Sequence, residues 1–373
     1  MSNKLVLVSG ASGYVGSHVA SAFLSAGYRV RGTVRSLAKK EKIAHLQKMI
    51  DEGKKLELVE ADLLIADSWD KAVDGCDFIA HTASPFFISC PDSQAEEKLY
   101  KPAKQGTLNV LSAAMKHGVK KVVLTSSMAA IAAGHKREGK TTHLDEPEKQ
   151  WSITDSKLCD NYSRSKTIAE KAAWEFVETA KKSGNEVFEL ATINPVLVTG
   201  PVLSRNWCQS ADIAKSFVDG SIPMIPNMQM NVVDVRDVAR AHVLAIEKPE
   251  ASGERFLVNA ESLNFRNWAQ HLAEEFRPLG FKVPTKNMPY WLCWTLSWFM
   301  SKLRIVQRNW GKSSTASNQK SRDVLGLEYI PASKSVVEMI HSMAQVHYPG
   351  IAVPKAYKEK YPDAFQDNRK SDE

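Results

Sequence analysis

Short apolar runs rich in Val, Ile and Leu alternate with longer stretches of helical periodicity over the first 200 residues. Strands buried on both faces appear as continuous apolar runs, joined by helices that return the chain to the same edge of the sheet. The pattern therefore predicts an α/β fold, a doubly wound and mostly parallel Rossmann sheet. The predicted strands are Leu5–Val8, Arg29–Val34, Leu56–Val59, Phe78–Ala80, Lys121–Thr125 and Phe188–Ile193. The predicted helices are Tyr14–Ser25, Leu37–Ile50, Ala66–Ala72, Ala103–Lys116 and Tyr162–Lys181.

The alternation becomes irregular after Gly200-Pro201, where six prolines from Pro223 to Pro289 divide the chain into short pieces. We expect residues 1–200 to form the sheet domain, with returns to it near 231–260 through Val232–Ala241 and Arg255–Val258. Residues 201–354 are then a smaller, mostly helical C-terminal lobe that contacts substrate. Residues 355–373 are rich in charged and polar side chains and are expected to form a solvated tail.

Composition narrows the function classes. The formal net charge of +7 is spread along the chain, without a basic stripe interleaved with aromatic residues, so a nucleic-acid partner is not expected. The five cysteines form no CxxC pair, and the ten histidines lack metal-ligand spacing. We therefore expect reduced thiols in a cytoplasmic protein with no metal site. The first apolar run leads directly into a glycine-rich turn, which indicates a strand rather than a secretory signal.

The most apolar later stretch is Tyr290–Met300, with the sequence YWLCWTLSWFM, and it is too short to cross a bilayer. The favoured interpretation is a buried helix or a lid over the active-site cleft, because its large side chains must be covered. The alternative is a membrane contact through residues 290–308, in which Lys302, Arg304 and Arg308 would face anionic lipid. The oligomeric state stays open.

A glycine turn follows the first strand in the segment Ser9-Gly10-Ala11-Ser12-Gly13-Tyr14-Val15-Gly16. In a dinucleotide-binding turn, the first glycine allows the tight bend and the second lets the backbone approach a pyrophosphate. The third allows close packing of helix and strand. The N-terminus of the next helix offers free N–H groups to phosphate. This context, after a strand and before a helix, predicts cofactor binding.

The end of the second strand bears on which cofactor is bound. NAD-specific Rossmann enzymes place an acidic residue about 20 residues beyond the glycine turn, where it binds the ribose 2′-OH. Here Arg35 stands 19 residues after Gly16, and no acid precedes it in Val30–Arg35. A guanidinium can bind a 2′-phosphate through paired, charge-assisted hydrogen bonds. NADPH is therefore the expected cofactor.

A Tyr–Lys pair and a serine supply candidate chemistry. Tyr162 and Lys166 share one helical face at i and i+4, and the ammonium is expected to lower the pKa of the phenol and suit it to proton transfer. The predicted strand before this helix delivers Ser126 and Ser127 at its carboxyl end, where ligands of open α/β sheets bind. Tyr100 and Lys104 repeat the spacing, but Pro102 lies between them and no Ser-Ser strand end precedes them.

The motifs GASGYVG, HTASP, VVLTSS, YSRSK and NPVLVTGP together resemble the extended short-chain dehydrogenase/reductases, part of the NAD-dependent epimerase/dehydratase family. Within them the chain is similar to the branch of dihydroflavonol reductases, cinnamoyl-CoA reductases and fungal methylglyoxal and aldehyde reductases. The similarity covers roughly residues 4–265.

The resemblance implies a role for each matching residue. Ser127 would contact the substrate carbonyl, Tyr162 would donate the proton, and Lys166 would hold the nicotinamide ribose. The pyrophosphate would be bound at the glycine turn, and Lys42 would be a second contact for the 2′-phosphate. The remaining cofactor-lining positions are Asp62 and Leu63 at the adenine, and Thr82, Ala83, Ser84, Pro195 and Val198. Ala132 stands where plant flavonoid reductases carry an Asn, which argues against a flavonoid substrate.

The resulting expectation is an NADPH-dependent reductase that transfers hydride to an aldehyde or ketone of a small to medium, apolar substrate. A 3β-hydroxysteroid-type dehydrogenase is the first alternative. A nucleotide-sugar epimerase or dehydratase is less favoured, because Ser127-Met128-Ala129 lacks the acidic residue that dehydratases place beside the strand-end hydroxyl. A non-catalytic cofactor-binding regulator is the alternative from another class, although such proteins usually lose the Tyr or the Lys.

Overall fold

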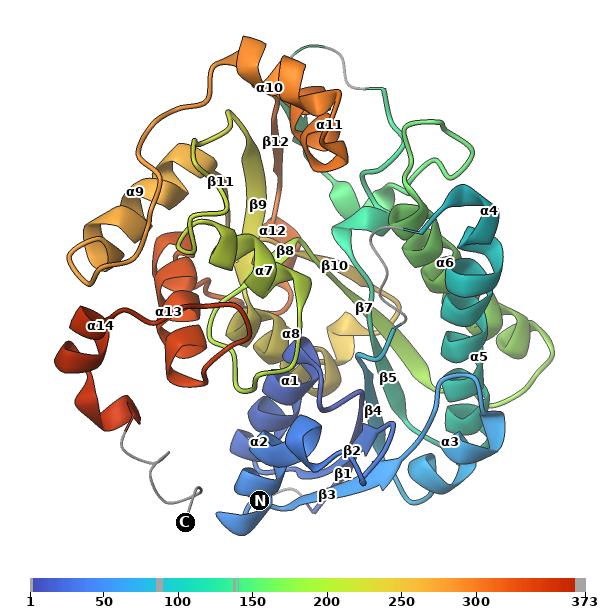
Figure 1. Ribbon diagram of the computed structural model, residues 1–373. Helices are drawn as coiled ribbons and strands as arrows, with labels where there is room; N and C mark the ends of the chain where they lie inside the picture. The colour runs from blue at the N-terminus through green and yellow to red at the C-terminus, as the bar shows by residue number, and fades with distance from the viewer. Residues whose placement is uncertain (1–2, 85–89, 137–138, 140, 366–373) are drawn as a thin grey trace.

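A seven-stranded parallel sheet forms the centre of the molecule in the computed structural model, which describes residues 3–84, 90–136, 139 and 141–365 (Figure 1). Its strand order, β10-β7-β5-β4-β1-β2-β3, reverses direction beside β1, as in a doubly wound dinucleotide-binding fold. The carboxyl ends of all seven strands therefore meet at one edge. The strands are β1 (Leu5–Ser9), β2 (Arg29–Val34), β3 (Leu56–Glu60), β4 (Phe78–His81), β5 (Lys121–Thr125), β7 (Glu189–Pro195) and β10 (Arg255–Val258).

Helices cover both faces of this sheet. One apolar cluster joins the sheet to α1 (Tyr14–Ser25), α2 (Lys40–Asp51) and α8 (Val235–Glu247). A second cluster joins the opposite face to α3 (Ala66–Val73), α5 (Lys101–Lys116) and α6 (Asn161–Lys182). Figure 1 shows α3, α5 and α6 together on one side of the sheet. The short helix α4 (Asp92–Ala95) and a π-helical turn at Glu96–Tyr100 lead into α5.

The predicted α/β sheet is confirmed, and most element boundaries agree with prediction to within three residues. One predicted return segment, Val232–Ala241, is two elements: β9 (Gln229–Asp234) and α8. The break falls at Asp234 because its carboxylate accepts a hydrogen bond from the Arg236 N–H at 2.8 Å and caps the new helix.

The third apolar cluster belongs to the C-terminal half. There β8 (Leu197–Thr199), β9 and β11 (Glu261–Asn264) form a small sheet, and β12 (Ser313–Ala316) pairs with β6 (Thr141–Leu144). The helices of this half are α7 (Gln209–Ser216), α9 (Phe265–Phe276), α10 (Tyr290–Ser297), α11 (Ser301–Arg308), α12 (Gln319–Asp323), α13 (Ala332–Gln345) and α14 (Lys355–Lys360).

Two expectations for this half differ from the structure. The charged tail begins with α14, whose Tyr357 is fully buried with its hydroxyl 2.9 Å from His341 Nδ1, so the tail is anchored at this residue while the rest of α14 is exposed. Residues 366–373 lie outside the described part. The stretch Tyr290–Met300 is not buried: Trp291 is 66% exposed and Phe299 is 88% exposed. Only Cys293 and Ser297 turn inward from α10.

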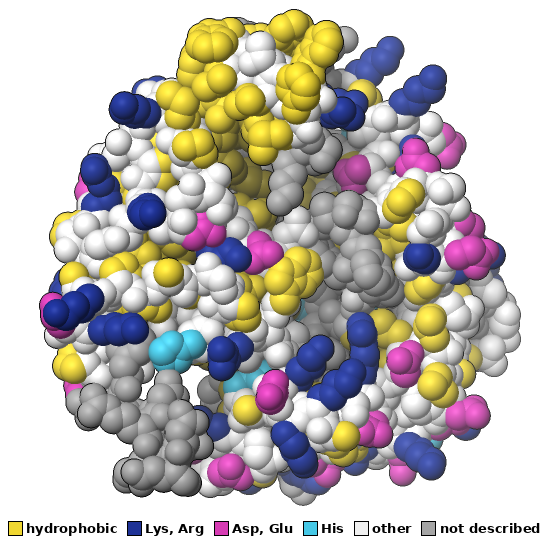
Figure 2. Space-filling view, viewed as in Figure 1, with side chains coloured by type: hydrophobic (Ala, Val, Ile, Leu, Met, Phe, Trp, Pro, Cys, Tyr) yellow, Lys and Arg dark blue, Asp and Glu magenta, His cyan; other side chains and the backbone are white. Residues whose placement is uncertain are grey.

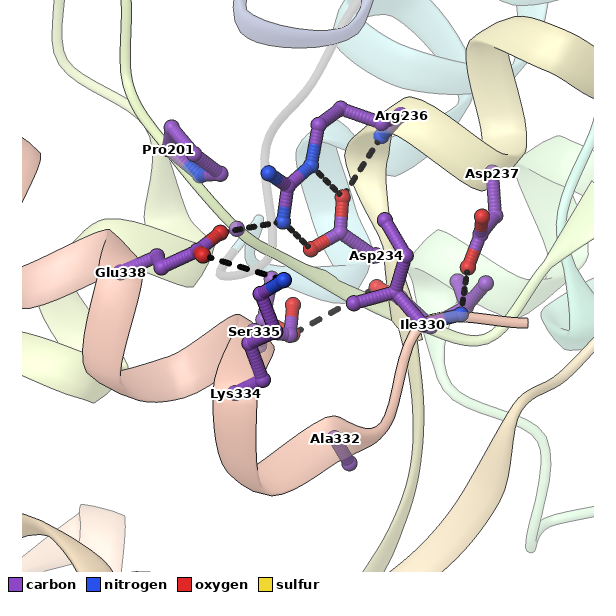
Figure 3. A network of polar contacts seen from close by, with 12 residues as sticks. Pro201, Asp234, Arg236, Asp237, Ile330, Ala332, Lys334, Ser335 and Glu338 are labelled. Atoms are coloured by element: carbon purple, nitrogen blue, oxygen red, sulfur yellow. Dashed lines mark hydrogen bonds and ion pairs between the residues drawn. The ribbon is translucent and has the colours of Figure 1, made fainter.

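A buried carboxylate network ties the C-terminal half to the sheet domain (Figure 3). Asp234 accepts two hydrogen bonds from the Arg236 guanidinium, both at 2.8 Å, and the same guanidinium lies 2.5 Å from Glu338 of α13. Asp237 of α8 accepts the Ile330 N–H at 2.8 Å, and burial raises the pKa of Asp237 to about 6. Because buried charge is stable only when it is paired or hydrogen-bonded, this network fixes α13 against α8.

Gly200 permits the close approach of backbone to this network. Its φ is +107°, and a Cβ there would lie 2.8 Å from Asp234 Oδ2. Gly27 also has a positive φ, +88°, but a Cβ there would meet no atom within 4 Å. We predict that Gly200→Ala lowers the free energy of unfolding by about 3 kcal/mol or more, and Gly27→Ala by about 1 kcal/mol. Urea denaturation measures both, and equal losses would contradict the proposed contact with Asp234.

Candidate active site

The glycine turn joins β1 to α1 and packs closely against neighbouring backbone. Gly10 has a φ of +65°, and a Cβ there would lie 3.1 Å from Ala83 Cβ. A Cβ on Gly16 would lie 2.3 Å from the Gly10 carbonyl oxygen. Gly13 is the N-cap of α1 and supplies no capping side chain, so the first N–H groups of the helix remain available. The turn therefore forms a cradle in which phosphate oxygens can approach the backbone.

The segment after β4 packs directly on this turn. The Thr82 hydroxyl donates to the Ser9 carbonyl at 2.5 Å, and the Ala83 N–H donates to Ser9 Oγ at 2.9 Å. His81 holds the other side of Ser9 Oγ, with its Nδ1 at 2.7 Å. Burial, with a smaller contribution from the charge of Lys166, lowers the pKa of His81 to about 3. The imidazole is therefore neutral and acts as an internal hydrogen-bond partner.

The predicted 2′-phosphate contacts lie at the same edge of the sheet. Arg35 directly follows β2, next to β1, and is exposed. Lys42 is an exposed residue of α2. Neither side chain forms an ion pair among the described residues. Asn206 was not found by sequence reasoning; its side-chain amide donates to the carbonyls of Ser12 at 2.9 Å and Lys42 at 2.8 Å. This amide holds the start of α2 beside the glycine turn.

The predicted adenine contacts follow β3. Asp62 Oδ1 accepts the Leu64 N–H at 2.9 Å, and its carbonyl accepts Trp69 Nε1–H at 2.8 Å. The Leu63 carbonyl accepts Asn109 Nδ2–H at 2.7 Å. These bonds fix the backbone of the loop beside the end of β2.

The predicted catalytic groups converge on the carboxyl end of β5. Ser127 follows this strand, and its Oγ accepts the Ala129 N–H at 3.1 Å. Tyr162 is in the first turn of α6, which begins because the Asp160 carboxylate accepts the Ser163 N–H at 2.9 Å. A hydrogen bond joins Tyr162 and Ser127. Lys166 Nζ lies 6.0 Å from the centroid of the Tyr162 ring.

A small cavity lies beside Lys166. It is lined by Ala83, Ser84, Ser126, Lys166 and Glu170, among others. The last two predicted cofactor positions lie in consecutive strands. Pro195 is the last residue of β7, and Val198 lies in β8.

The expectation that Lys166 lowers the pKa of the Tyr162 phenol is wrong. Burial raises the pKa of Tyr162 to about 12, although the hydrogen bond with Ser127 lowers it in part. Burial also lowers the pKa of Lys166 to about 8. Desolvation is the largest cause of both pKa shifts, because both groups are enclosed by protein. The phenol consequently holds its proton at neutral pH.

Glu170 is a buried residue that sequence reasoning missed. It lies four residues after Lys166 on the same face of α6, and its carboxylate accepts hydrogen bonds from Ser126 Oγ, Thr192 Oγ1, Asn194 Nδ2 and Arg255 Nε. Asn194 Nδ2 also donates to the Ser127 carbonyl at 3.2 Å. The i+4 spacing from Lys166 was the available signal. Glu170 therefore links the helix that carries Tyr162 to the strand end that carries Ser127.

The second tyrosine–lysine pair, Tyr100 and Lys104, does not follow the end of β5 as Tyr162 and Lys166 do. Tyr100 Oη donates to Asn161 Oδ1 at 2.5 Å, at the first residue of α6. Its hydroxyl therefore supports the start of the helix that carries Tyr162.

No group of three or more His, Cys, Asp or Glu side chains that could hold a metal ion occurs within the described residues. Across the same residues, no helix combines the length and the apolar character needed to cross a membrane.

Comparison with known proteins places this geometry in a family. The model of the NAD dependent epimerase/dehydratase family matches residues 6–259. Cinnamoyl-CoA reductase CAD2 of Medicago truncatula is 35% identical over 347 residues, which cover 92% of this chain and 96% of the plant protein. Cinnamoyl-CoA reductase 1 of Petunia hybrida is 36% identical over 349 residues, covering 92% and 93% of the two chains.

Solved structures agree with these relatives. Yeast methylglyoxal/isovaleraldehyde reductase Gre2 complexed with NADPH has a TM-score of 0.75 at 29% identity. The NADPH complex of Gre2 from Candida albicans has a TM-score of 0.74 at 32% identity. Each comparison covers 92% of this chain and 99% of the other. The chain therefore belongs to the NAD dependent epimerase/dehydratase family, in the branch of extended short-chain dehydrogenase/reductases that contains the cinnamoyl-CoA and methylglyoxal reductases.

Proposed function

We propose that the chain is an NADPH-dependent reductase that converts an aldehyde or ketone of a small to medium, apolar molecule to the alcohol. The observation that carries this proposal is the convergence of Ser127, Tyr162 and Lys166 on the strand edge that also holds the glycine cradle. In this proposal the sheet domain, residues 1–200 with the returns near 231–260, binds the cofactor. Residues 201–354 shape the substrate side.

The residues at the cofactor edge fit NADPH. The Gly10, Gly13 and Gly16 cradle accommodates the pyrophosphate, and the free N–H groups at the start of α1 complement its charge. Arg35 and Lys42 supply exposed positive charge at the position of the 2′-phosphate. We assign the adenine contacts to Asp62 and Leu63, and the remaining cofactor-lining positions to Thr82, Ala83, Ser84, Pro195 and Val198. When bound, NADPH supplies the hydride that reduces the carbonyl carbon.

The chain's own groups handle the oxygen of the substrate. Ser127 Oγ donates a hydrogen bond to the carbonyl oxygen and stabilises the negative charge that develops there. Tyr162 transfers its phenolic proton to this oxygen, which completes the alcohol, and the phenolate then regains a proton from solvent. A phenol with a pKa of about 12 is protonated at neutral pH, as the acid in a reduction must be. Lys166 holds the nicotinamide ribose and keeps positive charge beside the phenolate.

The residues that follow Ser127 in the chain are apolar, which supports an apolar substrate. Met128, Ala132, Leu144 and Val196 pack around the buried Ile131, Leu257 and Ala316. Ala132, where flavonoid reductases carry an Asn, therefore belongs to an apolar cluster. We place the activity in the cytoplasm, where thiols such as the five free cysteines stay reduced. The intact Tyr162–Lys166 pair favours an enzyme over a cofactor-binding regulator.

The first test of this mechanism removes the proton donor. Tyr162→Phe should lower kcat for NADPH-dependent aldehyde reduction by at least about 100-fold, because the alkoxide loses its general acid. Binding of NADPH, measured by fluorescence titration, should change little. Tyr28→Phe is a suitable control, because the Tyr28 hydroxyl also donates a hydrogen bond, to Glu247. Tyr28 packs on the opposite face of the sheet from α6, the helix that carries Tyr162. Similar activity in wild type and Tyr162→Phe would refute the assignment.

The second test concerns the choice of cofactor. Arg35→Ala should lower kcat/KM with NADPH by about tenfold or more and leave kcat/KM with NADH nearly unchanged, because the guanidinium contacts only the 2′-phosphate. Arg29→Ala provides the matched control, since Arg29 is an exposed arginine at the other end of β2. Steady-state kinetics with both cofactors give the result. A wild-type preference for NADH would contradict this role for Arg35.

The third test uses pH. Burial lowers the pKa of Lys166 to about 8, so its side chain is mostly charged below that pH and mostly neutral above it. Because kcat/KM reports ionisations of the free enzyme, kcat/KM for NADPH should fall as pH rises through about 8. A profile that stays flat from neutral pH to well above 8 would show that the charge of Lys166 does not support cofactor binding.

A further inference from the structure

The exposed face of α10 concentrates aromatic side chains. Trp291, Trp294 and Trp298 recur at i, i+3 and i+7, on one side of the helix, and are 66%, 44% and 65% exposed. Phe299 and Met300 extend this surface, which we call the tryptophan face. Figure 2 shows it as an apolar cap over one end of the molecule. Scattered exposed apolar residues need no explanation, but a contiguous group of large ones does.

All Lys, Arg, Asp and Glu residues in the chain segment around the tryptophan face are basic. Between residues 276 and 322 there are nine Lys and Arg residues and no Asp or Glu. This segment carries more positive charge than the net +7 of the whole chain, so the remaining sequence is acidic on balance. Lys286, Arg304, Arg308 and Lys312 of this segment are exposed, and we call them the flanking cations. None of the four forms an ion pair within the described residues.

Arg304 joins the two features. Its Nε donates to the Ser297 carbonyl at 3.1 Å, and its Nη2 donates to the Trp298 carbonyl at 3.4 Å. These bonds satisfy carbonyl groups at the end of α10 and hold positive charge beside the aromatic tip. Trp294 and Trp298 are also in edge contact, with centroids 5.2 Å apart. The basic and aromatic groups therefore form one ordered surface.

We propose that the tryptophan face and the flanking cations bind the surface of an anionic phospholipid bilayer. Tryptophan favours the boundary between headgroups and acyl chains, because its ring is apolar and its N–H is polar. Basic side chains beside an apolar helix face add attraction to anionic lipid. The eight residues of α10 are too few to span a bilayer, so the contact is with one leaflet.

Charge argues against a second copy of the chain as the occupant. A two-fold interface places the same patch on both sides, so it would bring the flanking cations of two copies together without an acidic partner in this segment. An anionic lipid surface supplies the opposite charge over the whole patch.

Vesicle co-sedimentation tests the proposal. The full-length protein should partition at low salt onto phosphatidylcholine vesicles that contain roughly one third phosphatidylserine, and should release as salt is raised. Vesicles of phosphatidylcholine alone should bind far less. Trp298→Ser combined with Phe299→Ser should abolish binding. Arg308→Gln combined with Lys312→Gln should lower the partition coefficient by about tenfold or more.

Two control variants match these changes elsewhere on the surface. Lys181→Gln with Lys182→Gln removes the same charge from the exposed end of α6, and Trp207→Ser with Leu158→Ser removes similarly exposed apolar side chains. Both should bind as wild type does. Unchanged thermal midpoints for all four variants would show that they fold. Absence of wild-type binding, full binding by the Trp298/Phe299 variant, or equal losses in the control variants would overturn the proposal. Self-association that depends on Trp298 and Phe299 would also overturn it and assign the face to a second copy.

Discussion

The arrangement of the site depends on the hydrogen bonds that the buried carboxylate of Glu170 accepts. A charge with about 1% of its residue surface exposed is tolerated only when several donors compensate its lost hydration. Here the donors come from the loop after β5, from β7 and from β10, while the carboxylate itself belongs to α6. Satisfying one group therefore sets the position of the catalytic helix relative to three strand ends.

Arg255 extends this constraint away from the site. Its guanidinium lies 3.8 Å from the centroid of the Trp151 ring, and its Nη1 donates to the carbonyls of Glu148 and Gln150. The loop before α6 is thereby attached to the edge strand β10. The Asp234–Arg236–Glu338 network (Figure 3) plays the corresponding part between the sheet domain and the C-terminal half.

Much of the fold could be predicted from sequence, because the apolar runs and helix boundaries of the first 200 residues are local signals. The glycine turn and the Tyr162–Lys166 pair were visible for the same reason: their residues lie close together in the chain. Glu170 was missed because an acidic residue within a long helix resembles a solvated one, and four of its hydrogen-bond partners lie 22 to 85 residues away. The predicted lowering of the Tyr162 pKa was wrong because the i, i+4 spacing from Lys166 does not show how deeply the two side chains are buried. The α10 tryptophans were expected inside because apolarity predicts burial only on average.

The neutral imidazole of His81 has a consequence for the range of conditions in which the fold persists. An unfolded histidine takes up a proton near its ordinary pKa of 6.5, whereas His81 in the folded protein does so only at about 3. Its contribution to stability is therefore complete above pH 6.5 and is progressively lost as pH falls toward 3. His45 and His242, whose pKa values burial lowers to about 4, act in the same direction. Lowering the pH thus adds protons to histidines of the sheet domain. His81, whose pKa is the lowest of the three, contacts Ser9, and Ser9 also accepts hydrogen bonds from the Thr82–Ala83 segment beside the glycine turn.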